Sequence, residues 1–570
     1  MAQLTVSGEP LKLVGEARDL GAHLSFTRVP RPGAVRERGE AAVAAAGRCG
    51  LAPLPFDARA ELTAAKTGQQ AAYGCEVTRL RKKARRQYRT DALRAIWGNL
   101  RKRRSPGLVL TLLAPGHRMD LDQVIPFQSL SAVREMLRRE HGPTAEFRQA
   151  WSAYRDGRRR VPGPIGIAWD EVRRLGWGWP SPEMLTRTAG PPLNMLTTPK
   201  GYWQHALRVG ARQALWAEAL KTRPDLDGIQ TGVDGSATCH LYRLGRLPED
   251  RRGLLRGILG GGLWTGSSLA HTGLVETAAC PHCGAAREDL HHRWWECPAW
   301  EETRRRHRVA QADRAGWPRC LLTHGIMPED PRLLEEESKL AAEADPPDEI
   351  RAPPERSVGA ARRVAWTDGA CRFNQDPRIR RAGWGVFWGP GDPENTGQPL
   401  AGLQQTNQRA ELRAATRAVN RGAEEVRTDS QYVVDGHARL GRGERAAARD
   451  GSDNADLWVQ FEEAVRRRGG PSSVLFTKVL GHAKARDVLE GRTTHEDKAG
   501  NDAADRLAVD AALSHAAPEA VVADLKQRLE RAREAQLMML DVSAAGLATA
   551  GPHGPGAPPG SGARAGSDPP

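Results

Sequence analysis

The sequence predicts a multidomain protein whose C-terminal part is an α/β unit, preceded by mostly α-helical regions and by a small cysteine-rich segment. Two observations lead to this prediction. Between residues 361 and 512, short apolar runs bounded by Gly and Pro alternate with helical repeats, which is typical of an α/β fold. Upstream, the patterns are almost all helical, and three of the eight Cys residues lie close together. A chain of 570 residues has room for about three or four domains.

The α/β unit is an ordered series of predicted strands and helices. Each strand pattern is rich in aromatic or aliphatic residues, and each helical pattern repeats its apolar residues every three to four positions. Two of the strands deliver carboxylates at their ends, Asp368 and Asp429. In chain order the strand patterns are RRVAWTDGAC, RAGWGVFWG, PLAGLQQT, EVRT and SSVLFTKVL, and the helical patterns are TNQRAELRAATRAVNRG, NADLWVQFEEAVRRRGG and GNDAADRLAVDAA.

Two further carboxylates lie on the apolar faces of predicted helices. Glu411 shares a helix face with small apolar residues, whereas Arg409 and Arg413 belong to a line of arginines on the other side. Asp505 also shares a face with apolar residues, whereas Asp502 lies on the polar side, where we expect solvent. A carboxylate on an apolar face is costly to bury unless another group compensates its charge.

These patterns predict that Asp368, Glu411, Asp429 and Asp505 converge. Four carboxylates that meet would repel one another unless divalent cations lay among them. Ligand sets made only of oxygen favour Mg²⁺ or Mn²⁺, and two such ions can activate a water and stabilise the leaving oxygen in phosphodiester hydrolysis. The site is therefore a candidate centre for metal-dependent hydrolysis.

The stretch resembles a type 1 ribonuclease H domain, because it carries TDGAC, TNQRAEL, TDSQYV, NADLW, GHA and GNDAAD in that order. The resemblance implies a five-stranded mixed sheet with flanking helices. It also implies cleavage of the RNA strand of RNA–DNA hybrids, with the four carboxylates holding two Mg²⁺ ions and Mn²⁺ as a substitute. The alternative is a catalytically silent ribonuclease H fold that acts as a nucleic-acid-binding protein.

The resemblance also assigns roles around the carboxylates. His482 matches the histidine of the family's mobile loop, which is associated with product release or proton transfer. The loop from 483 to 499 is longer than the family's version, so the role of His482 stays open. Four further residues match positions that contact the RNA strand, where the 2′-OH distinguishes RNA from DNA. They are Cys371, Asn374, Asn407 and Gln431.

The cysteine-rich segment CPHCGAAREDLHHRWWECPAW has the spacing of a zinc site. Cys280, Cys283 and Cys297, with His292 or His291, make a Cys₃His set suited to tetrahedral Zn²⁺. With His292 the spacing C-x₂-C-x₈-H-x₄-C resembles the zinc-binding segment downstream of reverse transcriptase in many non-LTR retrotransposons. Such a site is closed and structural, so we expect no catalysis from it. The alternative is unmetallated cysteines in a small core.

The N-terminal region adds a weaker resemblance. ARDLGAHLSF, the helices that follow it and AAYGCEV resemble the stretch just after the palm of a non-LTR retrotransposon reverse transcriptase, although no paired-aspartate motif occurs and we expect no polymerase activity. The basic segment 79–104 interleaves Tyr88 and Trp97 with twelve Lys and Arg residues. It is either a contact for a nucleic-acid backbone or a solvated helix face or nuclear localisation signal.

The remaining segments complete the predicted organisation. The Trp residues between 125 and 235 are expected in the core. We divide the chain into a thumb-like helical region with the basic segment (1–125), a helical connection region (126–250), a zinc-knuckle region (251–325), an acidic Pro-rich linker (326–358), the ribonuclease H domain (359–516), an amphipathic helix (517–542) and a disordered tail (543–570).

The whole chain fits this interpretation. Its net charge of +15 and pI near 9.8 suit a polyanionic partner, here an RNA–DNA hybrid. The cysteines show no disulfide rhythm, and the N-terminus lacks the apolar core of a signal peptide, so we expect an intracellular protein in a reducing compartment. No apolar run is long enough to span a bilayer, so we expect no membrane contact. The order of segments indicates a protein derived from a retroelement.

Overall fold

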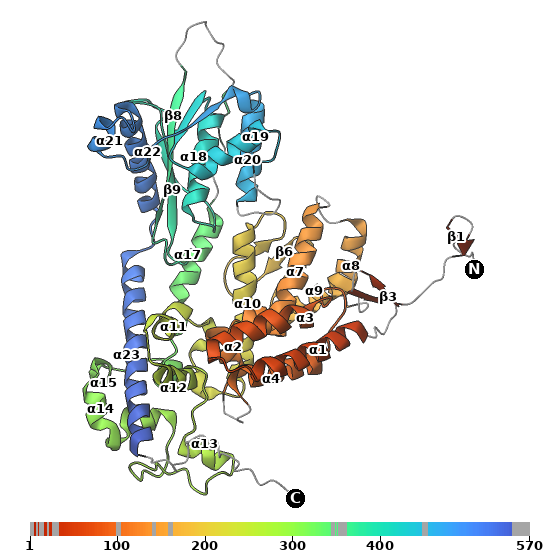
Figure 1. Cartoon of the computed structure of the whole chain (residues 1–570), viewed down its shortest axis with the longest axis vertical. Helices are drawn as coiled ribbons and strands as arrows, with labels where there is room; N and C mark the ends of the chain where they lie inside the picture. The colour runs from red at the N-terminus through yellow and green to blue at the C-terminus, as the bar shows by residue number, and fades with distance from the viewer. Residues whose placement is uncertain are drawn as a thin grey trace, which may run out of the picture. The chain divides into compact units, whose positions relative to one another are not determined.

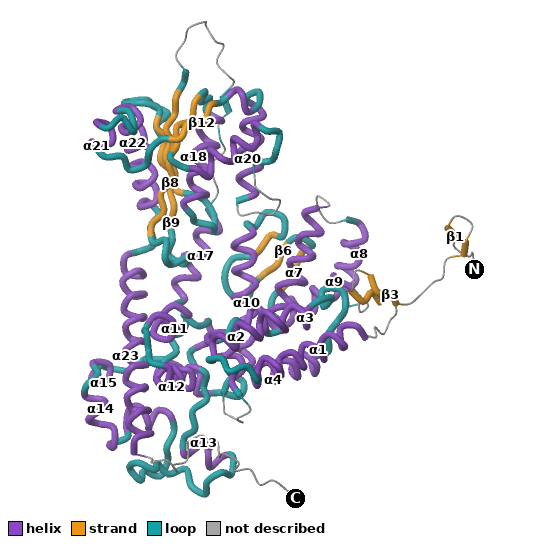
Figure 2. The backbone as a smooth tube through the Cα atoms, in the orientation of Figure 1, coloured by secondary structure: helices purple, strands orange, loops and turns teal. Residues whose placement is uncertain are grey.

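The structure is a computed structural model, and two units organise it (Figures 1 and 2). The first unit comprises residues 1–177, 208–330 and 524–570, and the second comprises residues 178–207 and 331–523. The residues described are 5–6, 9–10, 16–19, 22–25, 33–98, 104–139, 144–157, 163–343, 348, 350–351, 362–446 and 454–549. Among these residues, no helix is both long enough and apolar enough to cross a membrane.

The second unit contains the predicted five-stranded mixed sheet. Its strand order is β10-β9-β8-β11-β12. The three strands β8, β9 and β10 pair antiparallel, whereas β11 runs parallel to both β8 and β12. Their bounds are β8 Val364–Arg372, β9 Arg381–Phe387, β10 Thr396–Pro399, β11 Glu425–Thr428 and β12 Leu475–Lys478.

Helices cover both faces of this sheet (Figure 1). The helices of this part are α17 Pro331–Ala342, α18 Asn407–Asn420, α19 Gln431–Gly441, α20 Ala455–Arg467, α21 Ala485–Leu489 and α22 His495–Ser514. A Cβ at Gly385 would lie 2.3 Å from the carbonyl oxygen of Ala504, and one at Gly369 would lie 2.5 Å from the backbone nitrogen of Glu411. Glycine therefore lets α22 lie directly on one face of the sheet and α18 on the other.

One predicted strand is wrong in its position. The pattern PLAGLQQT predicts a strand over 399–406, but β10 ends at Pro399. Gly402 has a left-handed φ of 87°, which breaks the extended backbone. The Gln405 side-chain amide takes the place of strand-to-strand backbone hydrogen bonds here. It accepts from the Ala382 nitrogen at 2.7 Å and donates to the Leu400 and Gly402 carbonyls.

The arginines of α18 lie on the side opposite its apolar face, yet two of them do not face solvent. Arg409 and Arg413 are both buried. Arg409 forms a bidentate pair with Asp456, and Arg413 forms one with Asp348 at 2.9 and 3.1 Å. A helical wheel cannot show these pairs, because the aspartates come from distant parts of the chain.

The first unit is mostly α-helical, as predicted. Its larger helices are α1 Gly33–Gly50, α2 Phe56–Thr63, α4 Lys82–Trp97, α7 Leu121–Arg139, α8 Ala145–Arg155, α9 Gly163–Arg174, α11 Gly235–Leu244 and α12 Glu249–Leu259. Its shorter helices are α3 Gln69–Ala72, α5 Pro106–Leu108, α6 Gly116–Met119, α13 Gly266–His271, α14 Glu301–Arg305, α15 Arg308–Gln311 and α16 Arg319–His324.

The remaining elements are short strands, single turns and two helices that pass from one unit to the other. The strands are β1 Thr5–Val6, β2 Glu9–Pro10, β3 Glu16–Asp19, β4 Ala22–Ser25, β5 Gly178–Ser181, β6 Met184–Thr186 and β7 Leu193–Asn194. The two shared helices are α10 Lys200–Leu220 and α23 Glu519–Thr549. The turns are η1 Ala64–Gly68, η2 Val109–Leu113, η3 Pro224–Leu226, η4 Ile229–Thr231, η5 His292–Glu296, η6 Pro298–Trp300 and η7 Pro471–Ser473.

The predicted linker and tail contain helical structure. Within 326–358, α17 buries Leu333 and Leu340, and its Glu336 pairs with the buried Arg381 at 2.8 Å. The C-terminal helix α23 continues to Thr549, seven residues beyond the predicted boundary at 542. The rest of the predicted tail lies outside the described residues. The Trp residues predicted to be core are buried, namely Trp151, Trp169, Trp177, Trp179, Trp203 and Trp216.

Candidate active site

Two of the candidate carboxylates come from neighbouring parallel strands. Asp368 lies within β8, and Asp429 directly follows β11. In the register of these strands Thr367 is opposite Thr428. The residues that come next, Asp368 and Asp429, therefore lie side by side. The sheet therefore brings these two carboxylates together without any help from a loop.

Glu411 joins them from α18. The close contact of α18 with Gly369 places Glu411 against the strand that carries Asp368. Its carboxylate accepts a hydrogen bond from the Asn407 side-chain amide at 2.6 Å and another from the Ser430 hydroxyl. Because Ser430 caps the first turn of α19 and follows Asp429, it connects Glu411 to the end of β11.

Asp505 joins from α22 on the other face of the sheet. It lies close enough to Asp368 and Asp429 for its charge to raise the pKa of both. Asp502 instead forms an ion pair with Lys498 one helical turn away. The side chains of α22 thus have the phase expected from the helical wheel.

The electrostatics of the cluster show an excess of negative charge. Burial, together with the charges of Asp429, Asp505 and Glu411, raises the pKa of Asp368 to about 8. Burial is also the first cause of the raised pKa values of Glu411 and Asp429. Carboxylates whose pKa values are raised by burial and by neighbouring negative charges are typical of a cation-binding site. A ligand set made only of oxygen atoms fits Mg²⁺.

Two basic residues border the carboxylates. The Lys478 ammonium donates to the Asp429 carbonyl, and its charge lowers the pKa of Glu411 and of Asp429. His482 also lowers the pKa of Asp429; it is exposed and has a left-handed φ of 49°. A Cβ at Gly481 would lie 2.3 Å from the Asp429 carboxylate, so the GHA loop passes directly over that side chain.

The residues predicted to contact RNA lie in two groups. Cys371 and Asn374 are neighbours, with the Cys371 sulfur 3.9 Å from the Asn374 side-chain oxygen. Asn407 and Gln431 are the first residues of α18 and α19, and each donates to a carboxylate on its own helix, Glu411 and Asp435 respectively.

Sequence reasoning did not single out Ser430 or Lys478. Ser430 lies inside the TDSQYV motif, and its position after Asp429 at the start of a helix is an N-cap signal that could have found it. Lys478 could not have been found in this way, because only the pairing of β11 with β12 brings it to Asp429.

The first unit contains the predicted Cys₃His set. Among the described residues, Cys280, Cys283, His292 and Cys297 are the one group of three or more metal-ligating side chains whose ligand atoms all lie within 4.8 Å of one another. The Cys280 and Cys297 sulfurs are 3.8 Å apart, and the Cys283 sulfur is 3.4 Å from His292 Nε2. His291 lies outside this group and pairs with Glu296 at 3.1 Å.

The surroundings hold the cysteine cluster in shape. The π-helical turn η5 carries His292 and ends directly before Cys297. Trp294 and Trp295 are buried beside it, and their ring N–H groups donate to Thr323 and Leu322 carbonyls at 2.9 and 2.7 Å. A backbone hydrogen bond from Ala285, with contacts to Cys280, Cys297 and His292, lowers the pKa of the Cys283 thiol to about 7, whereas burial raises the pKa of Cys297 to about 12. Of the two, Cys283 is the one whose thiolate form is favoured.

The basic segment 79–104 is partly internal. Tyr88 is buried and its hydroxyl is hydrogen-bonded to Thr67 at 2.7 Å. Arg85 is buried against Glu171 at 2.6 Å, and Arg89 pairs with Asp120. Residues 99–103 lie outside the described part of the chain.

The fold and the carboxylate cluster define a domain of the ribonuclease H type. The sequence model of the family described as RNase H matches residues 361–513. Ribonuclease H of Erythrobacter litoralis is 37% identical over 159 residues, which cover 26% of this chain and 93% of that protein. The chain therefore belongs to the ribonuclease H family.

Each of these matches covers only part of the chain. Ribonuclease H1 of Rattus norvegicus is 44% identical over 79 residues, which cover 13% of this chain and 27% of that protein. The chain thus spans 27% of the length of the rat and human ribonuclease H1 proteins that it matches. The solved ribonuclease H1 of Halobacterium salinarum shares 24% identity over 26% of this chain and 95% of its own, with a TM-score of 0.16.

Proposed function

We propose that the domain at residues 361–513 hydrolyses the RNA strand of RNA–DNA hybrids. The observation that supports this most strongly concerns Asp368 of β8. It lies near enough to Glu411 of α18, Asp429 after β11 and Asp505 of α22 for all three charges to raise its pKa. A merely structural cluster would be expected to carry ion-pair partners on most of its acids. Here burial and mutual repulsion raise three of the four pKa values instead.

The four carboxylates would hold two Mg²⁺ ions, for which Mn²⁺ could substitute. Such ions supply an activated water and stabilise the leaving oxygen in phosphodiester hydrolysis. Asp368 must lose its proton to bind a cation, and its raised pKa means that cation and proton compete for it. Asn407 and Ser430 fix the direction in which the Glu411 oxygens point.

Residues at the rim would select and release the substrate. Asn407 and Gln431 begin α18 and α19, and Cys371 and Asn374 are neighbours at and just after the end of β8; on this proposal all four contact the RNA strand and its 2′-OH groups. His482 is exposed beside Asp429. On this proposal it contacts a phosphate of the substrate and assists release of the product.

The test compares two aspartates of the same helix. Asp505→Asn keeps the shape of the side chain and removes its charge, so it should abolish most Mg²⁺-dependent cleavage of an RNA–DNA hybrid. Asp502→Asn is the matched control, because Asp502 only pairs with Lys498 and surface changes of this kind have small effects. RNA duplex and DNA duplex serve as substrate controls. An active Asp505→Asn with an inactive Asp502→Asn would refute this site.

The unmutated protein decides between the two candidate functions. Cleavage of the hybrid that needs Mg²⁺ supports the nuclease. Hybrid binding without cleavage, and without dependence on divalent ions, would support the silent, nucleic-acid-binding fold instead.

We also propose that Cys280, Cys283, His292 and Cys297 bind a structural Zn²⁺. Support comes from the closed set of ligand atoms and from the tryptophans that cover it. The order of a basic helical region, this knuckle and a ribonuclease H domain further supports an origin in a non-LTR retroelement. Polymerase motifs in the genomic sequence upstream of Met1 would be expected on this view, and their absence there would count against it.

A further inference from the structure

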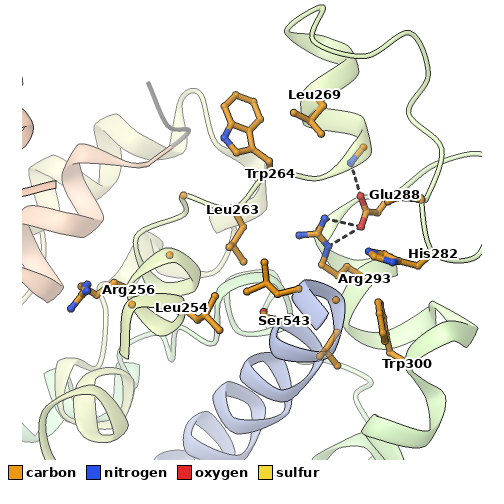
Figure 3. A pocket seen from close by; sticks show the side chains of 18 of the residues that line it. Leu254, Arg256, Leu263, Trp264, Leu269, His282, Glu288, Arg293, Trp300 and Ser543 are labelled. Carbon is orange, nitrogen blue, oxygen red and sulfur yellow. Dashed lines mark hydrogen bonds and ion pairs between the residues drawn. The ribbon is translucent and has the colours of Figure 1, made fainter. Parts of the chain in front are cut away.

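A large pocket lies in the first unit, away from the carboxylates. Its volume is about 1310 Å³, above the roughly 300–1,000 Å³ typical of pockets for drug-sized ligands. Its walls come from the start of α2, the end of α4, α12, the loop before α13, the cysteine knuckle and the end of α23. Figure 3 shows Trp264, His282, Trp300 and Ser543 around this space.

Aromatic rings line several sides of the pocket. Trp97 packs edge-on against Phe56 with ring centroids 5.6 Å apart, and His282 packs edge-on against Trp300 at 4.7 Å. Trp264 is half-buried and makes no hydrogen bond, ion pair or ring contact with any residue that the structure describes. An indole left without such partners at the edge of a cavity is available to stack on a flat ligand.

The polar groups of the pocket are fixed in place. Glu288 is buried and accepts from the Gly266 nitrogen at 2.6 Å and from Arg293 at 2.7 and 2.8 Å, so its charge is compensated. Arg256 lies over the Phe56 ring, its guanidinium carbon 5.0 Å from the centroid. The pocket therefore combines aromatic rings with compensated ion pairs, because Arg256 also pairs with Glu249 at 2.8 Å, and its surface is not uniformly apolar.

An exposed basic stripe of α4 leads to this pocket. Residues at intervals of three or four lie along one helix face, and this face carries Lys83, Arg86, Thr90, Arg94 and Trp97. The three basic side chains are exposed, and the last residue of the stripe lines the pocket. Just beyond the helix, Arg104 lies over the Trp97 ring with its guanidinium carbon 6.0 Å from the centroid.

We propose that this pocket binds an unpaired base of a nucleic-acid single strand whose phosphates follow the basic stripe of α4. Stacking on aromatic side chains combined with a positive track for the backbone is how proteins hold single strands without sequence preference. A base in a duplex could not enter, because its faces are covered by its neighbours. The chain's net charge of +15 fits a polyanion as the ligand.

The test measures binding of a fluorescein-labelled 12-nucleotide DNA single strand to the full chain by fluorescence anisotropy, without Mg²⁺. A DNA single strand is no substrate for a hybrid ribonuclease, so the result is independent of cleavage. Trp264→Ala should weaken binding about tenfold, as expected for losing one stacking platform. The control Trp317→Ala removes another half-buried tryptophan of the first unit that lies outside the pocket, and should leave affinity unchanged.

An oligonucleotide with abasic sites separates the base from the backbone. It should bind the unmutated protein about tenfold more weakly than the intact strand, and Trp264→Ala should cause no further loss. Equal binding of the intact and abasic strands would overturn the proposal. So would duplex DNA that binds as tightly as the single strand with the same dependence on Trp264. Displacement by thymidine monophosphate at micromolar concentration would overturn it in favour of a free-nucleotide site.

Discussion

Ser430 holds one candidate metal ligand, Glu411, and is the chain neighbour of another, Asp429. It donates to Glu411 and accepts from the Val433 nitrogen as the N-cap of α19, directly after Asp429. One side chain therefore both starts a helix and orients a candidate metal ligand. The two roles can be separated by comparing Ser430 with an N-cap residue that starts a helix but orients no candidate metal ligand.

Ser430→Ala should lower stability by about 1 kcal/mol, the usual loss for an N-cap, and should also reduce hybrid cleavage because Glu411 loses its orienting donor. Thr144→Ala is the matched control, since Thr144 caps α8 in the first unit and touches no candidate ligand. Thermal unfolding and a cleavage assay measure the two effects. Equal cleavage by both variants would show that the hydroxyl only caps its helix.

The pKa of Asp368 predicts how stability responds to pH in the absence of divalent ions. Its folded pKa of about 8 exceeds its ordinary value of 3.8, so between these pH values the folded protein binds more protons than the unfolded one. The free energy of unfolding should therefore fall as pH rises from 4 to 8, by at most about 1.4 kcal/mol per pH unit. Asp368→Asn should flatten this dependence, as measured by urea unfolding. An unchanged slope would contradict the assignment.

At the scale of elements, the two faces of helix α4 differ in their surroundings. Arg85 on its inner face is paired with the buried Glu171, whereas Lys83 and Arg86 on its outer face are exposed. The same segment is therefore partly a buried ion-pair network and partly an exposed basic surface, on which Arg86 lies 3.9 Å from Glu218. The alternatives that the sequence left open, a contact for a nucleic-acid backbone or a solvated helix face, concern the outer face of this helix and not its inner one.

Arg85→Ala should destabilise the protein by about 1–3 kcal/mol, because the buried Glu171 loses one of its two cations and keeps only Arg174 at 2.8 Å. The double change of Lys83 and Arg86 to Ala should leave stability unchanged. It should also flatten the salt dependence of single-strand binding by about one unit of slope for each phosphate that the variant no longer neutralises. Urea unfolding and binding measured at several salt concentrations separate the two. A double variant with the original salt slope would mean that this face does not contact phosphates.

Periodicity predicts the elements better than it predicts their surroundings. Glu411, Asp429 and Asp505 can be placed because helix faces and the end of β11 follow from local patterns. Asp368 is predicted at a strand end, but β8 continues to Arg372, because pairing with β9 extends the strand. Gln405 falls within a predicted strand, because no local pattern shows that its amide bonds to Ala382 on another segment. The burial of Arg413 depends on Asp348, 65 positions away, so no helical wheel could reveal it.

For the whole molecule, the cysteine cluster should stabilise one unit and not the other. Cys280 and Cys297 belong to the hydrophobic core of the first unit, together with Trp294 and residues of α23. The ribonuclease H sheet has a separate core. Loss of a metal from the cysteine cluster should therefore destabilise the first unit and leave the ribonuclease H sheet unaffected.

Chelation of Zn²⁺ should increase amide hydrogen exchange in residues 280–297 and in the part of α23 packed near them, while β8 and β9 keep their protection. Mass spectrometry of exchanged peptides measures this. The Cys283→Ser variant should show the same pattern without a chelator. Purified protein without zinc, or equal loosening of the sheet, would contradict the assignment.

The first unit is assembled from three stretches, and its last one follows the ribonuclease H domain in the chain. Gln536 of α23 is fully buried, and its amide donates to the Thr238 and Gly325 carbonyls at 2.8 Å. During synthesis on the ribosome, the nuclease sheet can therefore close while the first unit still lacks its last helix. A nascent chain stopped before residue 524 would expose the groove meant for α23, and we expect such a chain to need chaperones that a completed one does not.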